Sequence, residues 1–155
     1  MTFAVVKLRS SMNVKSDIRD TMDMLKLSRV NHCVLIQDTP ENKGMLRKAK
    51  DYITWGEVDV EVVEKLLKER ALMIGKEPLT DKIVKEGSPC KNIKELAAAL
   101  TEGSVKYRDV KGVNPIFRLH PPRKGGYEGL KRAFKTGGAL GYRGKEINAL
   151  ILKMI

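Results

Sequence analysis

Cysteine, aromatic residues and long apolar runs are scarce in this sequence. The 155 residues include two cysteines, Cys33 and Cys90, which do not make a disulfide framework. The first apolar run, residues 3–6, is far shorter than a signal-peptide core, and no run approaches the roughly 18 residues of a membrane span. These absences argue against a disulfide-rich secreted scaffold and against a membrane protein. We expect an intracellular protein with reduced thiols.

Acidic residues are scarce only in the last third of the chain. Residues 105–155 hold 12 Lys or Arg and three acidic residues, a net charge of +9, whereas residues 1–60 carry +2 and residues 61–104 are neutral. The whole chain carries +11. A distribution this uneven indicates a polyanionic partner, either nucleic acid or an acidic membrane surface.

Residues able to bind a metal or catalyse a reaction are few and widely spaced. There is no C-x-x-C or H-x-H spacing, and Cys33 lies in a predicted buried strand, where it is better explained as a small core residue. No catalytic motif surrounds His32 or His120. Phosphodiester chemistry usually needs clustered carboxylates, and the three acids of the last third are scattered. We therefore expect no catalytic residue, no metal and no cofactor.

The apolar pattern of the first half predicts a compact α+β fold. Short runs rich in β-branched residues alternate with helical patterns, and Asn13 is expected to cap the first helix. Thr39 followed by Pro40 is a strong signal for the start of the second helix. The β-α-β-α-β order describes helices packed on a small sheet. The expected strands are 2–10, 32–37 and 53–58, and the second helix falls within 38–52.

The second half is expected to be mostly helical. Asp59 can cap a helix, and shorter helices follow at 79–87 and 92–103, each beginning near Thr or Asn and ending at Gly. A short strand is expected at 116–120. The segment 146–155 has apolar residues at helical spacing, so we expect a C-terminal helix that docks on the core.

A basic, glycine-rich segment occupies residues 118–145, and we call it the basic arm. It holds eight Lys or Arg, one acidic residue and seven of the chain's 13 glycines. Cations neutralise phosphates, glycines let backbone N–H groups approach them, and aromatic rings stack on unpaired bases. The pattern favours nucleic-acid binding, and the alternative is a solvated loop that only adds charge. The aromatic residues in or beside the arm are Phe117, Tyr127, Phe134 and Tyr142.

The composition of the arm also bears on its order. Glycine makes the backbone costly to fix, and charges of one sign repel one another when no phosphate lies between them. We therefore expect residues 121–144 to be poorly ordered until RNA binds.

Outside the arm, five cations flank predicted strand ends and helix starts. They either extend an RNA footprint or are scattered solvent-facing charge. Trp55, in the third predicted strand, either packs in the core or stacks on a base. The five cations are Arg9, Lys15, Arg29, Lys43 and Arg47.

Three long stretches carry a family resemblance: RVNHCVLIQDTPENKGMLRKAKDYITWGEVD (29–59), IFRLHPPRKGGY (116–127) and GGALGYRGKEIN (137–148). They resemble the archaeal branch of the ribosomal protein L-thirty family, whose eukaryotic relative is the large-subunit protein L-seven. The resemblance spans essentially the whole chain. It implies a ferredoxin-like core, here residues 1–58, and a C-terminal subdomain, here residues 59–155.

The resemblance implies a structural, non-enzymatic constituent of the large ribosomal subunit, located in the cytoplasm within the ribosome. The expected partners are large-subunit ribosomal RNA and other large-subunit ribosomal proteins, with no membrane and no small-molecule substrate. Charge alone adds Lys131, Arg132 and Lys135 to the expected RNA contacts. The matching stretches carry RNA contact onto Arg118, His120, Arg123, Lys124 and Arg143.

Two other functions remain open from the sequence. A free-standing RNA-binding or RNA-chaperone module would not co-sediment with large subunits through a high-salt wash. An enzyme acting on nucleic acid would show turnover, and the sparse carboxylates argue against it.

Overall fold

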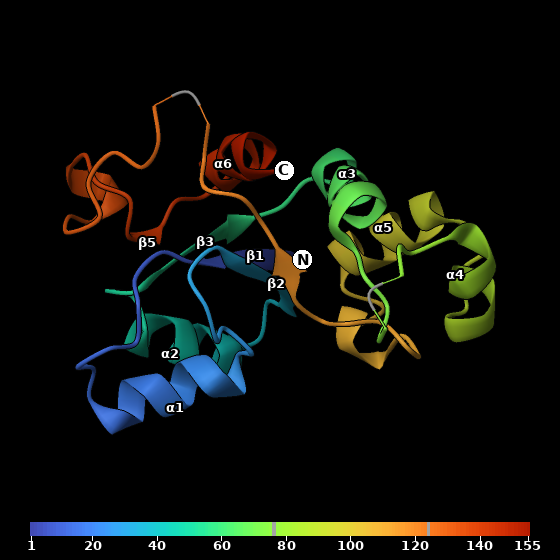
Figure 1. The fold of residues 1–155 in the computed structure, drawn as a ribbon, viewed down its shortest axis with the longest axis horizontal. Coiled ribbons are helices and arrows are strands. Elements are labelled where there is room, and N and C mark those ends of the chain that lie inside the picture. The colour runs from blue at the N-terminus through green and yellow to red at the C-terminus, as the bar shows by residue number, and fades with distance from the viewer. Residues whose placement is uncertain (76, 124) are drawn as a thin grey trace.

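A five-stranded sheet lies at the centre of the structure, a computed structural model that describes residues 1–75, 77–123 and 125–155 (Figure 1). The strand order is β4-β2-β1-β3-β5, and β1 pairs antiparallel with both β2 and β3. Since β2 and β3 therefore run parallel on either side of β1, helix α2 joins them in the split β-α-β arrangement of ferredoxin-like folds. The predicted α+β, ferredoxin-like fold class is confirmed. The strands are β1 (Thr2–Lys7), β2 (His32–Gln37), β3 (Ile53–Glu57), β4 (Phe117–Arg118) and β5 (Gly141–Tyr142).

One face of the sheet is covered by the two helices of the first half, α1 (Ser16–Met24) and α2 (Pro40–Lys48) (Figure 1). Phe3 and Val5 point to this face, where they pack in a cluster with residues of both helices, and Trp55 of β3 joins them. Successive strand residues point to opposite faces. The alternation in β1 thus assigns its odd-numbered side chains to the layer of α1 and α2.

The opposite face is covered by the second half of the chain. Ala4, Val6 and Cys33 point into a larger apolar cluster. That cluster includes residues of helices α3 (Val60–Arg70), α5 (Ile93–Glu102) and α6 (Glu146–Met154), and α4 (Asp81–Gly87) packs beside α5 (Figure 1). The expected docking of the C-terminal helix is borne out by the burial of Ile147 and Ile151 in this cluster.

Several predicted boundaries need correction. The first strand ends at Lys7 rather than Ser10, and α1 begins after Lys15, because Asn13 adopts a left-handed conformation (φ 56°) outside the helix. The prediction for α2 is confirmed: Thr39 is its N-cap and accepts a hydrogen bond from the Asn42 N–H at 3.3 Å. Asp59 is at the N-cap of α3 but makes no capping bond with its side chain.

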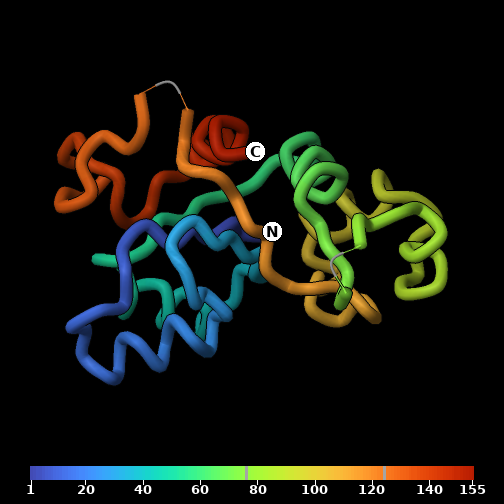
Figure 2. The backbone as a smooth tube through the Cα atoms, in the orientation of Figure 1, coloured from blue at the N-terminus to red at the C-terminus, as the bar shows by residue number. Residues whose placement is uncertain are grey.

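The strand expected at 116–120 is only two residues long. After β4, the Leu119 N–H still donates to the Asn31 carbonyl (3.1 Å), but the His120 N–H donates to the Met154 carbonyl of α6 (2.9 Å). The chain therefore leaves the sheet and runs along the end of α6. Figure 2 shows this path, from the group of α3, α4 and α5 past the sheet to α6.

The basic arm returns to the sheet as β5, a strand that the sequence pattern did not predict. Gly141 and Tyr142 pair in parallel with Thr54 and Trp55 of β3. Just after this strand, the backbone of the arm is in close contact with that of β3. A Cβ on Gly56 would lie only 1.9 Å from the Gly144 carbonyl oxygen. Only glycine at position 56 lets the end of the arm lie this close to β3.

Parts of the arm make defined contacts within the protein. Ala139 and Leu140 are buried, and the Tyr127 hydroxyl donates to Asn31 Oδ1 at 2.8 Å. A Cβ on Gly138 would lie 2.1 Å from the Arg132 carbonyl oxygen, so the glycine allows the arm to fold tightly on itself. How ordered residues 121–144 are before RNA binds stays a prediction.

Two basic side chains are buried at the end of the sheet where β1 finishes and β2 begins. Lys7 is fully buried, and its ammonium donates to Ser11 Oγ, the Leu27 carbonyl and the Ser28 carbonyl, which uses all three of its donors. Burial lowers the pKa of Lys7, and Asp23 partly opposes this.

His32 is the second buried base, and its surroundings favour the neutral imidazole. Its Nδ1 accepts from the Arg29 N–H (3.4 Å) and lies 3.2 Å from Ser28 Oγ. Burial lowers the pKa of His32, and the nearby cations Arg118, Arg29 and Lys7 lower it further. Since Nδ1 is an acceptor, the proton of the neutral ring is on Nε2.

We predict that the free protein loses stability as the pH is lowered from 7 to 5. Below about pH 6.5, the histidine of the unfolded chain takes up a proton that folded His32 does not, so the free energy of unfolding falls. Urea unfolding at several pH values measures this. His32→Asn keeps an acceptor near the position of Nδ1 and should show a flatter profile between pH 5 and 7. An equally steep profile in this variant would contradict the assignment.

We also propose that residues 1–58 form a module whose stability depends on residues 59–155. Alone, the module would expose the face that bears Ala4, Val6 and Cys33. A module this small has a marginal core. Its thermal midpoint, followed by circular dichroism, should lie more than about 10 °C below that of the full chain. Equal midpoints would show that the second half is an independent appendage.

A matched pair in α6 checks that the loss comes from this packing. Ile151 is fully buried and Leu152 is 46 % exposed. In the full chain, Ile151→Ala should lower the free energy of unfolding by about 2–5 kcal/mol. Leu152→Ala should change it by less than about 0.5 kcal/mol.

Candidate nucleic-acid interface

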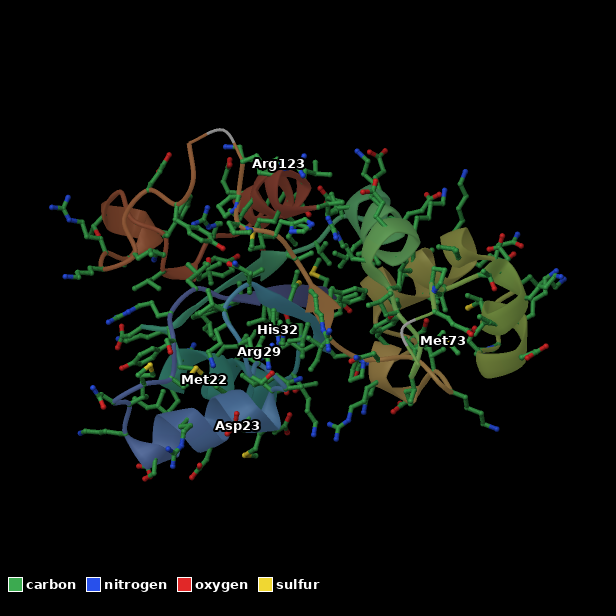
Figure 3. All side chains as sticks on the ribbon, in the orientation of Figure 1. Met22, Asp23, Arg29, His32, Met73 and Arg123 are labelled. Atoms are coloured by element: carbon green, nitrogen blue, oxygen red, sulfur yellow. The ribbon has the colours of Figure 1, made fainter. Side chains whose placement is uncertain are left out.

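The first group of candidate residues lies at the end of the sheet beside His32. Arg118 of β4 is directly opposite His32 of β2 in the antiparallel ladder, so the two side chains lie on one face. Arg29 is bonded to the same histidine ring through its N–H, and Figure 3 shows Arg29 and His32 next to each other. Both arginines are exposed. The fold thus brings together two predicted RNA contacts that lie far apart in the sequence.

The second group surrounds a hollow of about 420 Å³ next to the β3–β5 edge of the sheet. Lys43 and Arg47 come from α2, and Lys135 comes from the basic arm. A hollow of this volume is within the range of small-ligand sites, about 300–1,000 Å³. Three predicted contacts from both halves of the chain therefore line one site.

Aromatic rings form part of the same hollow. Phe3, Trp55 and Tyr142 line it, and the ring centroids of Trp55 and Tyr142 are 6.4 Å apart at an interplanar angle of 52°. Tyr142 is 44 % exposed, whereas Trp55 is nearly buried at 9 %. The sequence left Trp55 between core packing and base stacking. In the structure most of its surface belongs to the core and one part lines the hollow.

Two acidic residues, Asp38 and Glu57, partly neutralise the positive charge of this hollow. Asp38 forms an ion pair with Lys43 at 2.6 Å, and Glu57 Oε1 accepts a hydrogen bond from the Tyr142 hydroxyl at 2.6 Å. That bond orients the exposed ring and raises the pKa of Tyr142. Arg47 and Lys135 have no ion pair among the residues that the structure describes.

Other predicted contacts lie apart from these two groups. Arg123 lies beside α6, since its N–H donates to the Lys153 carbonyl at 3.0 Å (Figure 3). Arg9 lies 5.1 Å from the centre of the Tyr52 ring. Lys124 lies outside the described residues. The remaining candidate residues are all exposed, and they are Lys15, His120, Lys131 and Arg132.

Arg143 is held inside the fold. Its guanidinium lies 4.6 Å from the centre of the Phe134 ring and donates to the Ala139 carbonyl (3.1 Å) and Thr54 Oγ1 (3.3 Å). Burial lowers its pKa, although nearby Glu128 opposes the shift. These contacts tie the arm to β3, so its part in any RNA contact remains a prediction.

The four aromatic residues expected to offer ring faces have different environments. Phe117 is fully buried and stacks on Tyr107 with ring centroids 4.8 Å apart. Phe134 is covered by Arg143, and Tyr127 is partly buried with its hydroxyl bonded to Asn31. Tyr142 is the most exposed of the four. Phe117 belongs to the core and Tyr127 packs against it, because apolar rings gain more by burial than by exposure.

Groups suited to metal binding or covalent catalysis do not gather in the described part of the chain. It holds no cluster of three or more His, Cys, Asp or Glu placed to bind a metal ion. Burial raises the pKa of the Cys33 thiol to about 12, so the reactive thiolate is strongly disfavoured. Among the described residues, no helix has the length and apolar character needed to cross a membrane.

Comparison with known proteins gives relatives over the whole chain. The family model described as ribosomal protein L30p/L7e matches residues 3–53. A protein of Methanoregula boonei named large ribosomal subunit protein uL30 is 52 % identical over 153 residues, which cover 98 % of this chain and 99 % of the relative. Proteins of the same name from Methanobrevibacter smithii and Thermoplasma volcanium are 48 % and 46 % identical, and the matches cover 99 % and 98 % of this chain.

These matches confirm the resemblance seen in the sequence, including its archaeal branch. They also confirm that the protein is a ribosomal structural protein of the cytoplasm rather than an enzyme. High identity over nearly the full length of each relative extends the relationship beyond the matched residues 3–53. The chain belongs to the ribosomal protein L30p/L7e family.

Proposed function

We propose that this protein is a structural constituent of the large ribosomal subunit and binds the ribosomal RNA of that subunit through basic surfaces. Its relatives carry the name large ribosomal subunit protein, and its own charge excess lies in the last third of the chain. The observation that carries the RNA-binding proposal is the hollow in which Lys43, Arg47 and Lys135 meet around exposed Tyr142.

Electrostatics supports an anionic occupant for this hollow. Cations placed close together repel one another, and two acids only partly balance the three cations there. Arg47 and Lys135 remain free of ion pairs among the described residues. Phosphates that enter would relieve the repulsion and release counterions, which is the main source of affinity for nucleic acids.

The aromatic wall supports RNA in particular. Tyr142 presents a ring beside the cations, and Glu57 fixes its orientation through the hydroxyl. An unpaired base could stack on this ring while its phosphate meets Lys135 or Arg47. Recognition of unpaired bases by stacking is a common mode in RNA-binding proteins.

The basic arm connects the hollow to the first cationic group, which lies beside His32. Its first residues form β4 with Arg118 beside His32, and its last residues form β5 with Tyr142. We infer that the arm lies along the RNA between these two anchors, with Arg123, Lys131 and Arg132 as further phosphate contacts. Arg9, Lys15 and His120 would extend the contact at its margins. Other large-subunit ribosomal proteins are the expected protein partners.

Affinity for large-subunit ribosomal RNA should fall steeply with salt. If about six phosphates are contacted, raising the salt from 50 to 200 mM should cost on the order of a thousandfold in affinity. Filter binding at several salt concentrations measures the slope. The double variant Arg47→Gln, Lys135→Gln should weaken binding and flatten the slope. Lys82→Gln, Lys85→Gln makes the same charge change on α4 and should leave the slope unchanged. Equal effects of the two pairs would refute the hollow as a binding site.

Loss of the Tyr142 ring should weaken RNA binding without reducing the salt slope. Stacking on one base contributes about 1–3 kcal/mol, so Tyr142→Leu should reduce affinity by about fivefold or more. Tyr142→Phe keeps the ring and loses only the bond to Glu57, so it should bind RNA nearly as well as the native protein. If both variants bind RNA as tightly as the native protein does, the ring does not stack on RNA.

A further inference from the structure

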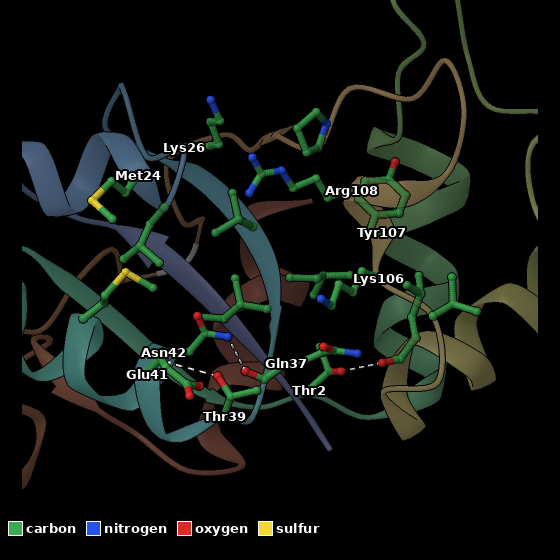
Figure 4. Close-up of a pocket in the computed structure, with 18 residues that line it drawn as sticks. Thr2, Met24, Lys26, Gln37, Thr39, Glu41, Asn42, Lys106, Tyr107 and Arg108 are labelled. Atoms are coloured by element: carbon green, nitrogen blue, oxygen red, sulfur yellow. Dashed lines mark hydrogen bonds between the residues drawn. The ribbon is translucent and has the colours of Figure 1, made fainter.

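A groove beside β2 is separate from the surfaces described above. Its volume is about 360 Å³, and it is lined by Val34, Leu35 and Ile36 of β2. One wall comes from the end of α1 and the start of α2. The other comes from the turn around Tyr107, in the second half of the chain (Figure 4). The groove therefore lies between the two halves, with an apolar strand at its base.

The edge of β2 is open along this groove. On the side away from β1, β4 pairs only with His32 and Cys33, and no described strand pairs with the rest of β2. The Asp38 N–H, directly after β2, donates to the Met1 carbonyl. The even-numbered residues of β2 therefore direct their backbone N–H and C=O groups toward β1. Since backbone groups alternate along an antiparallel strand, the N–H and C=O of Leu35 point into the groove.

Gln37 also points its backbone toward the groove, but its carbonyl is already used. That oxygen accepts from Asn42 Nδ2 at 2.8 Å and from the Thr39 N–H at 3.0 Å. Three backbone groups of the strand thus remain available: the N–H and C=O of Leu35 and the N–H of Gln37. An extended peptide can bind such an edge through main-chain hydrogen bonds.

The rim of the groove is basic. Three cations line it, Lys26 on one wall and Lys106 and Arg108 on the other, against one described acidic residue, Glu41 (Figure 4). A second copy of this chain would bring the same cations together and be repelled. The charge complements an occupant that carries carboxylates.

The backbone at Lys26 gives an independent reason to assign its side chain a role. Lys26 follows α1 in a left-handed conformation with φ 61°. The Leu27 N–H donates to the Met22 carbonyl (2.8 Å) and the Lys26 N–H to the Asp23 carbonyl (2.9 Å), which is the Schellman pattern at a helix end. Glycine is the usual residue there, because other side chains strain this conformation. Lysine at this position carries conformational strain that glycine would avoid, although its charge is favourable at the end of a helix, and its side chain lines the groove.

We propose that the open edge of β2 binds an extended segment of another protein, in which apolar residues are flanked by carboxylates. Its backbone would pair with Leu35 and Gln37, its apolar side chains would cover neighbours such as Met24, which is 65 % exposed, and its carboxylates would meet Lys26, Lys106 and Arg108. About four peptide residues would match the open length of the strand. This inference does not rest on RNA binding.

The test uses the full chain and two capped peptides of eight residues. The acidic peptide has alternating valine and threonine in its middle and two glutamates at each end, and the control peptide has lysines in place of the glutamates. Amide resonances and hydrogen exchange are followed by NMR. The acidic peptide should shift groove resonances and slow exchange at the Leu35 and Gln37 amides by about tenfold, and the control should do neither. Equal binding of both peptides, or no protection at Leu35, would overturn the proposal.

Two variants separate the groove from the fold and from the RNA surface. Lys26→Gly should keep or raise the melting temperature, because glycine relieves the left-handed strain, yet weaken the acidic peptide about threefold. Arg108→Glu should weaken binding of the acidic peptide about tenfold. Both should bind ribosomal RNA like the native protein, and Arg47→Gln, Lys135→Gln should bind the peptide normally. If oligouridylate shifts the groove resonances and the acidic peptide does not, the groove is an RNA site and the proposal is wrong.

Discussion

The structure depends on the burial of β1 on both of its faces. All six residues of this strand are buried, so two separate layers must cover it. Helices α1 and α2 supply one layer from the adjacent sequence, and α3, α5 and α6 supply the other from the second half. Burial of apolar surface contributes roughly 25 cal/mol per Å², and this is the main force that holds the two halves together. The positions of β4 and β5 at the edges of the sheet follow from that packing.

The positions of β4 and β5 at the sheet edges determine which groups the basic side chains can contact. Some are used inside the fold: Lys7 donates to three oxygens, and Arg143 ties the arm to β3. Others, such as Arg47 and Lys135, lack an ion pair among the described residues and lie where β5 brings the arm next to α2. A protein with a net charge of +11 must pay for such crowding in self-repulsion, which a polyanion relieves. Which cations are bonded within the fold and which lack an ion pair therefore says as much about a polyanionic partner as the net charge does.

The two edges of the sheet offer different chemistry. Beside β3 and β5, cations and an exposed ring surround a hollow suited to phosphate and base. Beside β2, an apolar floor and unpaired backbone groups suit a peptide. Both edges are open because β4 and β5 have two residues each, too short to cover the strands they join. Taken together, the two proposals would place RNA and protein at opposite edges of one small sheet.

Three features could be predicted from the sequence because they are properties of neighbouring residues: the alternation of strands and helices, the start of α2 at Thr39 and Pro40, and the concentration of charge in the last third. It also carried the family resemblance through long matching stretches. Three other features depend on how distant segments pack: β5 pairs with β3, Lys135 and Arg47 line one hollow, and Arg143 turns inward. Periodicity reports which face of an element is apolar and says nothing of which distant segment will cover it. That choice is made by sheet order, register and close backbone contacts such as the one at Gly56, which arise only when the whole chain packs.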